Sequence, residues 1–137
     1  MNRRTFLATS AMGVIGTLTG CTAAQPRGIS PNSKLNHACI GVGNMGDADI
    51  SNFKTHAGTQ IVALCDVDRN HLAKAAAVFP GARTYTDWRE LLAKEGDRID
   101  SVNIAVPDHM HAIIAANAMR AGKHVYCQKP LCHDISE

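Results

Sequence analysis

The sequence contains no run of basic residues. Its formal net charge is +2, and without Arg3 and Arg4 twelve Lys and Arg residues face twelve Asp and Glu residues. Proteins that capture nucleic acids electrostatically concentrate Lys and Arg on one face or in one segment. The charge pattern therefore gives no support to nucleic acid as a partner.

The five cysteines form no Cys-x-x-Cys pair. Structural zinc sites in short chains need closely spaced ligand pairs, so this spacing excludes such a site and we predict no metal. Apart from Cys21, the thiols are Cys39, Cys65, Cys127 and Cys132. Most lie in or beside apolar runs, and a disulfide framework is typical of small secreted chains without a core. We therefore expect buried, inert thiols.

No apolar run in the sequence is long enough to span a membrane. The first residues, Met1-Asn2-Arg3-Arg4-Thr5-Phe6-Leu7, instead place paired arginines before a short segment of small and apolar residues that ends near Thr19. This arrangement resembles a Tat-type export signal. We expect the protein to be exported to the periplasm or the cell envelope.

The segment Leu18-Thr19-Gly20-Cys21 resembles a bacterial lipobox, in which Cys21 would carry a lipid anchor. The alternative is an ordinary signal that is cleaved near Ala24. Residues 22–34 contain two prolines among small polar residues, which is typical of a solvated linker. The sequence thus predicts an export signal at 1–21, a linker at 22–34 and a domain at 35–137, with membrane contact through the lipid alone.

Beyond the linker, strand-like and helix-like segments alternate along the chain. The predicted strands are 35–42, 60–65, 83–85, 101–106 and 124–127. The predicted helices are 45–56, 70–79, 87–94 and 109–121. Alternation at this rhythm predicts an α/β fold of the Rossmann-like class, with a doubly wound parallel sheet and right-handed crossovers.

Apolar spacing also predicts which helical side chains face the core. In the first helix these are Met45, Ala48 and Phe53 or their neighbours. In the last helix the available apolar residues are Ile113, Ile114, Ala118 and Met119. The segment from Asp87 to Glu90 resembles a capping box, and Gly122 suits a helix C-cap.

A glycine-rich motif, Gly41-Val42-Gly43-Asn44-Met45-Gly46, directly follows the first predicted strand. Its first glycine permits a tight turn, the second lets the backbone approach a pyrophosphate, and the third lets the helix pack closely on the strand. The helix N-terminus then directs N–H groups at the phosphates. A glycine-rich turn alone is weak evidence, but the strand before it and the helix after it agree. The motif predicts a dinucleotide site containing Gly41, Gly43, Asn44, Met45 and Gly46.

Asp66 stands twenty residues after Gly46, at the end of the second predicted strand. A carboxylate there accepts hydrogen bonds from the adenosine ribose hydroxyls and repels a 2′-phosphate, which favours NAD over NADP. Arg69 lies close by and could offset that repulsion, so NADP stays the less favoured alternative. A solvated strand-end acid is the structural alternative for Asp66.

Two further segments follow strands at the same predicted edge. The first, Ala105-Val106-Pro107-Asp108-His109-Met110-His111, places His111 one turn into a helix, where a histidine is more often structural than catalytic. In the second, Lys129 follows the last strand. An ammonium there can hydrogen-bond a hydroxyl or carbonyl oxygen and stabilise charge that develops during hydride transfer. A solvated surface lysine is the alternative.

Together these segments resemble the Gfo/Idh/MocA oxidoreductase family, the group around glucose–fructose oxidoreductase and inositol dehydrogenase. The resemblance covers about residues 35–137. It rests on the glycine motif, on the segment from Pro107 to His111, and on Ala121-Gly122-Lys123-His124-Val125 followed by Lys129-Pro130.

The resemblance implies roles for several residues. Lys129 would be catalytic and lie near the nicotinamide and the reacting sugar oxygen, while Pro107, His111 and Gln128 would line the nicotinamide side of the cleft. It also implies that further acid/base residues belong to a C-terminal substrate domain that is absent from this chain. We therefore expect the chain alone to be inactive.

Two positions depart from the family pattern. The family normally has Glu-Lys-Pro where this chain has Gln128-Lys129-Pro130, so a charge that would pair with or orient the lysine becomes a neutral amide. Asp108 stands where the family often carries asparagine, which adds a negative charge near the cofactor edge. The first departure weakens the case for charge-assisted catalysis.

These features predict an exported NAD-dependent enzyme that acts on a sugar, polyol or related carbohydrate. Because free NAD is scarce outside the cytoplasm, we expect the cofactor to be tightly retained, and we expect the full-length protein to form a homo-oligomer. One alternative is a glycoside hydrolase that uses bound NAD through transient oxidation. A second is a non-catalytic, surface-tethered nucleotide-fold module.

Overall fold

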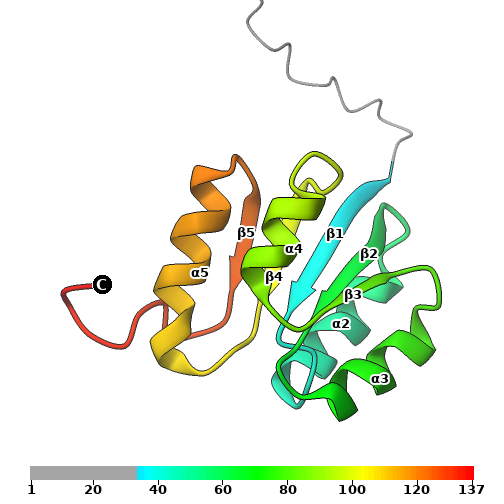
Figure 1. Ribbon diagram of the computed structural model, residues 1–137, viewed down its shortest axis with the longest axis horizontal. Helices are drawn as coiled ribbons and strands as arrows, with labels where there is room; N and C mark the ends of the chain where they lie inside the picture. The colour runs from blue at the N-terminus through cyan, green and yellow to red at the C-terminus, as the bar shows by residue number, and fades with distance from the viewer. Residues whose placement is uncertain (1–33) are drawn as a thin grey trace, which may run out of the picture. The chain divides into compact units, whose positions relative to one another are not determined.

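The computed structural model describes residues 34–137, and the predicted signal and most of the predicted linker lie outside this range. Strands and helices alternate along the described residues (Figure 1). The strands are β1 (Leu35–Ile40), β2 (Thr59–Cys65), β3 (Arg83–Tyr85), β4 (Ser101–Ile104) and β5 (His124–Cys127). The helices are α2 (Met45–Thr55), α3 (Arg69–Val78), α4 (Trp88–Glu95) and α5 (Asp108–Arg120). None of these helices is long and apolar enough to cross a bilayer.

The five strands form one parallel sheet in the order β3-β2-β1-β4-β5. The chain winds outward from β1 to β3, returns to the other side of β1, and continues outward to β5. The predicted α/β fold with a doubly wound sheet is confirmed. Ligands of such sheets bind at the carboxyl edge, where the strand order reverses between β1 and β4.

A bulge in β2 sets which side chains face each side of the sheet. His37 pairs with Ile61, but Ala38 pairs with Ala63, so Val62 is an extra residue in the ladder. The extra residue places Ile61 and Leu64 on the same side of the sheet, in one apolar cluster.

Apolar clusters fill both sides of the sheet. Helices α4 and α5 cover one face and α2 and α3 cover the other, as Figure 1 shows. The first cluster contains Ala38, Ile40, Ala63, Cys65, Leu91, Ile99, Val102, Ile104, Ile114, Ala115 and Ala118. The second contains Cys39, Val42, Ile50, Ile61, Leu64, Leu72 and Ala75. Together they hold the carboxyl ends of the strands in fixed relative positions.

The predicted core face of α2 is wrong for Met45 and Ala48, which are both exposed. The buried residues of this helix are Gly46, Asp49 and Ile50. Gly46 must lie against the β1–α2 turn, and residues three and four positions later lie on the same side of a helix. The glycine contact therefore turns Asp49 and Ile50 inward and leaves Met45 in solvent.

In α5, the prediction holds for Ile114 and Ala118 but is wrong for Ile113 and Met119, which are 47% and 59% exposed. The buried face of the helix is completed by His111 and Ala115. These residues follow helical spacing from His111, so a polar side chain occupies the first turn of the buried face. Apolar content alone does not reveal that choice.

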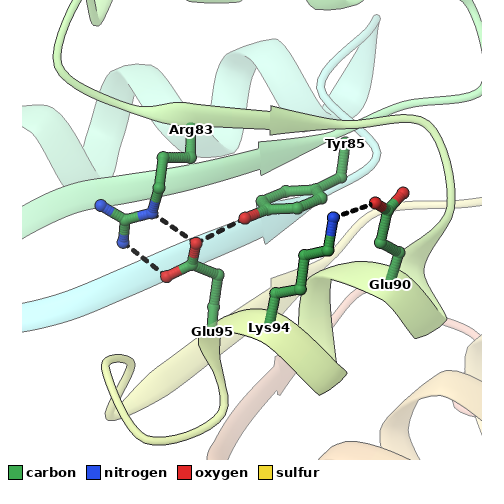
Figure 2. Close-up of polar contacts among 5 residues, drawn as sticks. All are labelled: Arg83, Tyr85, Glu90, Lys94 and Glu95. Atoms are coloured by element: carbon green, nitrogen blue, oxygen red, sulfur yellow. Dashed lines mark hydrogen bonds and ion pairs between the residues drawn. The ribbon is translucent and has the colours of Figure 1, made fainter.

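A buried carboxylate ties the edge strand β3 to α4 (Figure 2). Glu95 is 1% exposed and accepts hydrogen bonds from Nε and Nη2 of the Arg83 guanidinium and from the Tyr85 hydroxyl, which lies 2.5 Å away. Burial alone would raise the pKa of Glu95, but the hydrogen bonds from Arg83 and Tyr85 hold it below its usual value. The ionised carboxylate therefore secures the short strand.

Side-chain and glycine caps end two of the helices. Asp87 caps α4 by accepting from the Arg89 N–H at 2.8 Å, but Glu90 bonds Lys94 at 2.6 Å (Figure 2), so Glu90 does not act as the second half of the predicted capping box. Gly122, at a φ of 73°, follows the end of α5 in the left-handed conformation that favours glycine. The predicted C-cap is confirmed.

The four cysteines of the described residues are free. Cys39 and Cys65 are buried as predicted, whereas Cys127 and Cys132 are only partly buried. Burial, with smaller contributions from nearby carboxylates, raises the pKa of Cys65 to about 12. Such a thiol is unreactive at neutral pH.

Candidate dinucleotide site

The turn between β1 and α2 has a backbone path that only glycine permits at two positions. Gly41 has a φ of 83°, and a Cβ there would lie 2.2 Å from the carbonyl oxygen of Ala105. A Cβ on Gly46 would lie 2.0 Å from the carbonyl oxygen of Gly41. Both obstacles are backbone atoms, which cannot move aside without disturbing the sheet. The first and third glycines of the motif therefore fit the roles given to them.

Gly43 is tight for a different reason. A Cβ there would lie 2.3 Å from a ring nitrogen of His71, a residue of α3. The obstacle is a side chain, which can rotate. The absence of a side chain at Gly43 therefore leaves room for the His71 ring beside the loop.

The glycine loop leaves donors free. Among the described residues, no carbonyl or side chain accepts from the backbone N–H groups of Gly43 and Asn44. Asn44 also has a positive φ of 48° and precedes the first residue of α2. Unpaired N–H groups at a helix N-terminus form an anion site, so the loop suits a pyrophosphate.

Asp66 is tied to this loop by its carboxylate. Oδ2 accepts from the N–H of Val42, and Oδ1 accepts from the N–H of Asp68, each at 2.8 Å. A carboxylate has about four acceptor positions, so two backbone bonds leave room for ribose hydroxyls. Its negative charge is thereby fixed beside the glycine loop.

A cleft of about 620 Å³ opens at the carboxyl edge of the sheet. Five of the predicted site residues line it, namely Gly41, Gly43, Asn44, Asp66 and Pro107. The other predicted site residues, Met45, Gly46, Arg69, His111, Gln128 and Lys129, are not among the described residues that line this cleft. Gly46 is buried behind the loop.

The cleft is also lined by residues that were not among the predicted site residues, namely Val67, Trp88 and Arg89. Trp88 lies at the start of α4, and the Arg89 guanidinium lies 4.6 Å from the centroid of its ring. Val67 lines the same cleft and is 89% exposed. An exposed apolar side chain and an aromatic ring with a cation on its face suit a flat heterocycle. Val67 lies two residues after β2 and Trp88 three residues after β3, and these positions could have indicated them because both strands end at this edge.

Lys129 follows β5, next to the end of β4. The N–H of Gln128 donates to the carbonyl oxygen of Ile104 at 2.9 Å and continues the pairing of these strands. On the other side of Lys129, the carbonyl oxygen of Pro130 lies 2.5 Å from His111 Nδ1. Lys129 itself is exposed. His111 is 1% exposed and therefore supports the segment after Lys129 from the protein interior.

The amide of Gln128 does not point to solvent. Its Nε2 lies 2.8 and 2.9 Å from the two carboxylate oxygens of Asp49, a buried residue of α2. This contact joins residues 79 positions apart in the sequence. Asp49 was not among the predicted site residues, and its position three residues after Gly46, on the buried side of α2, was the signal that could have indicated it.

The family model described as "Oxidoreductase family, NAD-binding Rossmann fold" matches residues 35–137. The chain belongs to the Gfo/Idh/MocA family. The predicted NAD cofactor is confirmed at this level, and the glycine loop, its free N–H groups and Asp66 fit the pyrophosphate and ribose of a dinucleotide.

Two curated relatives illustrate the range of the family. A glycosyl hydrolase family 109 protein of Saccharopolyspora erythraea is 34% identical in an alignment that covers 99% of this chain and 35% of the relative. An inositol 2-dehydrogenase of Corynebacterium glutamicum is 33% identical over 104 residues, which cover 75% of this chain and 30% of the relative. The chain thus spans about a third of the length of these relatives.

Solved structures show the same fold. Myo-inositol 2-dehydrogenase from Lactobacillus plantarum superposes with a TM-score of 0.71 at 31% identity, over 76% of this chain and 30% of that one. The WlbA dehydrogenase from Bordetella pertussis, solved with NADH and UDP-GlcNAcA, gives a TM-score of 0.66 at 27% identity, over 72% of this chain and 30% of that one. The chain carries an NAD-binding oxidoreductase domain.

Proposed function

We propose that this chain is the cofactor-binding domain of an exported NAD-dependent enzyme that transfers hydride to and from a sugar, a polyol or a related carbohydrate. The observation that carries the proposal is the shared cleft of the glycine loop and Asp66 at the carboxyl edge of the sheet. Inositol dehydrogenases among the relatives support a polyhydroxylated substrate.

In this proposal, different residues of the chain bind the pyrophosphate, bind the ribose and stabilise charge on the substrate. The free N–H groups of Gly43 and Asn44 bind the pyrophosphate, and Asp66 accepts hydrogen bonds from the adenosine ribose. Bound NAD supplies the hydride acceptor or donor. The Lys129 ammonium donates a hydrogen bond to the reacting oxygen of the substrate and stabilises the charge that develops there as the hydride moves.

Asp66 also favours NAD over NADP. A 2′-phosphate placed at its carboxylate would bring two negative charges within hydrogen-bond distance, which is strongly unfavourable at a partly buried site. Among the described residues, Arg69 at the start of α3 forms no ion pair with Asp66. Arg69 therefore does not neutralise the negative charge of this carboxylate.

Titration of NAD and NADP into purified protein by calorimetry tests this assignment. We expect Asp66→Asn to reduce the preference for NAD over NADP by about tenfold or more, the effect of roughly 1.4 kcal/mol. Asp68→Asn is the matched control, because it removes a neighbouring charge while asparagine still caps α3. Equal loss of both affinities in Asp66→Asn would mean that Asp66 only holds the loop.

We further propose that a Tat-type signal exports the protein and that Cys21 anchors it. An enzyme outside the cytoplasm must retain its cofactor, so we expect one nicotinamide nucleotide per protein molecule after purification of the full-length protein. Denaturation followed by assay of the supernatant measures this ratio. A protein that purifies without nucleotide would contradict retention of the cofactor.

Membrane fractionation of the Cys21→Ser variant tests the lipid anchor.

The second candidate function is glycoside cleavage through transient oxidation. A family 109 glycosyl hydrolase among the relatives favours it, because its alignment covers 99% of this chain. Net accumulation of reduced nicotinamide during turnover supports the dehydrogenase, whereas product release without net reduction supports the hydrolase. Unchanged turnover in Lys129→Met would remove the catalytic role of this lysine, and a full-length protein without any turnover would support the non-catalytic alternative.

A further inference from the structure

The contact between Asp49 and Gln128 explains the departure from the family's Glu-Lys-Pro pattern. Asp49 is 8% exposed, and Gln128 Nε2 lies within 2.9 Å of both of its carboxylate oxygens. A buried carboxylate without a donor is costly, and a charge-assisted hydrogen bond from an amide offsets that cost. Gln128 therefore does not merely lack a charge, since its amide is the donor that Asp49 requires.

A glutamate at position 128 would not fit this partner. Its carboxylate would face that of Asp49 at about hydrogen-bond distance, without a proton between them. Two like charges so close cannot both stay ionised without a large energetic cost. Glutamine at 128 and aspartate at 49 are thus a matched pair, in which each residue makes the other acceptable.

The pair also determines where Lys129 stands. The Gln128 N–H is fixed by Ile104 on β4, its amide is fixed by Asp49 on α2, and the carbonyl of Pro130 is fixed by His111 on α5. The backbone of Lys129 is therefore anchored on both sides. One anchor, Asp49, belongs to the helix whose N-terminus adjoins the glycine loop.

We propose that Asp49 and Gln128 form a positioning pair that fixes Lys129 relative to the cofactor-binding helix α2. The proposal rests on the proposed catalytic role of Lys129 for its effect on turnover. The pair acts through Lys129, because neither Asp49 nor Gln128 is among the described residues that line the cleft of about 620 Å³. It links cofactor binding at the loop to the placement of the ammonium at the end of β5.

The test compares three variants of the full-length protein, namely Gln128→Glu, Asp49→Asn and the reversed pair that carries both changes. In the reversed pair an asparagine amide donates to a glutamate, which restores the hydrogen bond with opposite polarity. We expect Gln128→Glu to lower kcat by about tenfold to a hundredfold, because misplacement of a catalytic group by about 1 Å has effects of this size. The reversed pair restores kcat to within about threefold of the parent protein. Gln60→Glu adds the same charge at an exposed position of β2 and leaves kcat unchanged.

A double-mutant cycle with Lys129→Met separates positioning from a general structural role. If the pair acts through the lysine, Gln128→Glu produces almost no further loss of kcat in the Lys129→Met background. A loss of the same size in both backgrounds, or no recovery in the reversed pair, would overturn the proposal.

Amine labelling followed by mass spectrometry gives a readout that does not depend on turnover. We expect the rate of Lys129 acylation to change at least about twofold in Gln128→Glu and to return in the reversed pair, while Lys34, an exposed lysine, is unaffected. Identical Lys129 rates in all variants would refute the positioning pair. If Lys129→Met keeps full turnover while labelling still responds, the proposed catalytic role fails and the pair stands.

Discussion

His37 provides a test of the fold through the pH dependence of stability. Its side chain is 2% exposed, its Nδ1 lies 2.7 Å from the Ser101 hydroxyl, and its ring packs against Phe53 at a centroid distance of 4.5 Å. Burial lowers the pKa of His37 from 6.5 to about 4. The folded protein therefore keeps this histidine neutral at pH values where the unfolded chain binds a proton.

The sign and size of the effect follow from linkage. As the pH falls below 6.5, the unfolded chain gains a proton that the folded state does not bind, so the free energy of unfolding decreases until about pH 4. A shift from 6.5 to about 4 corresponds to roughly 3 kcal/mol at 1.36 kcal/mol per pKa unit. This is a large part of the stability of a domain of this size.

Urea unfolding at a series of pH values between 4 and 7 measures this slope. We expect His37→Asn, which cannot titrate in this range, to flatten it, although the variant loses some stability at pH 7. His109→Asn, at an exposed histidine, is the control and keeps the slope. A slope between pH 6.5 and 4.5 that is the same in His37→Asn as in the parent protein would refute the assignment of this loss to the buried imidazole.

Two further predictions concern contacts described above. Glu95→Gln should lower the free energy of unfolding by about 1–3 kcal/mol in urea titrations, because it breaks an ion pair whose carboxylate is buried while its guanidinium is partly exposed. In the parent protein, protonation of Glu95 should lower the free energy of unfolding in the same way as the pH falls below about 4.5. Glu90→Gln, in an exposed pair, should cost less than about 0.5 kcal/mol, and equal losses would show that burial is irrelevant. Gly46→Ala should abolish NAD binding and lower the melting temperature by several degrees, because its Cβ would meet the Gly41 carbonyl at 2.0 Å. Gly81→Ala, where a Cβ meets nothing within 4 Å, should bind NAD normally, and a Gly46→Ala protein with unchanged affinity would contradict the tight turn.

The sheet could be predicted from the sequence because its signals are local. Continuous apolar runs predict strands buried on both faces, and their alternation with helices leaves few possible topologies. The observed strands differ from the predicted bounds by at most two residues at either end. The glycine motif is equally local, since its spacing directly encodes a turn.

The helix faces could not be predicted from apolar content. In α5 apolar residues occur all round the helix, and in α2 the apolar residues Met45 and Ala48 are exposed while Asp49 is buried. The inward faces are determined by Gly46 and His111, which contact other parts of the chain. The pairing of Asp49 with Gln128 depends on the order of β1, β4 and β5 in space. A contact that exists only after the strands are ordered leaves no pattern along the sequence.

The hydrogen bond from the Val42 N–H to the Asp66 carboxylate has a consequence for redesign of this protein. The carboxylate that discriminates between cofactors also closes the nucleotide loop onto the neighbouring strand. Replacing Asp66 with a residue that tolerates a 2′-phosphate removes the hydrogen-bond acceptor of the Val42 N–H as well as the negative charge. A switch to NADP would therefore require a second substitution that holds the N–H of Val42, and single exchanges at this position would trade selectivity against affinity for both cofactors.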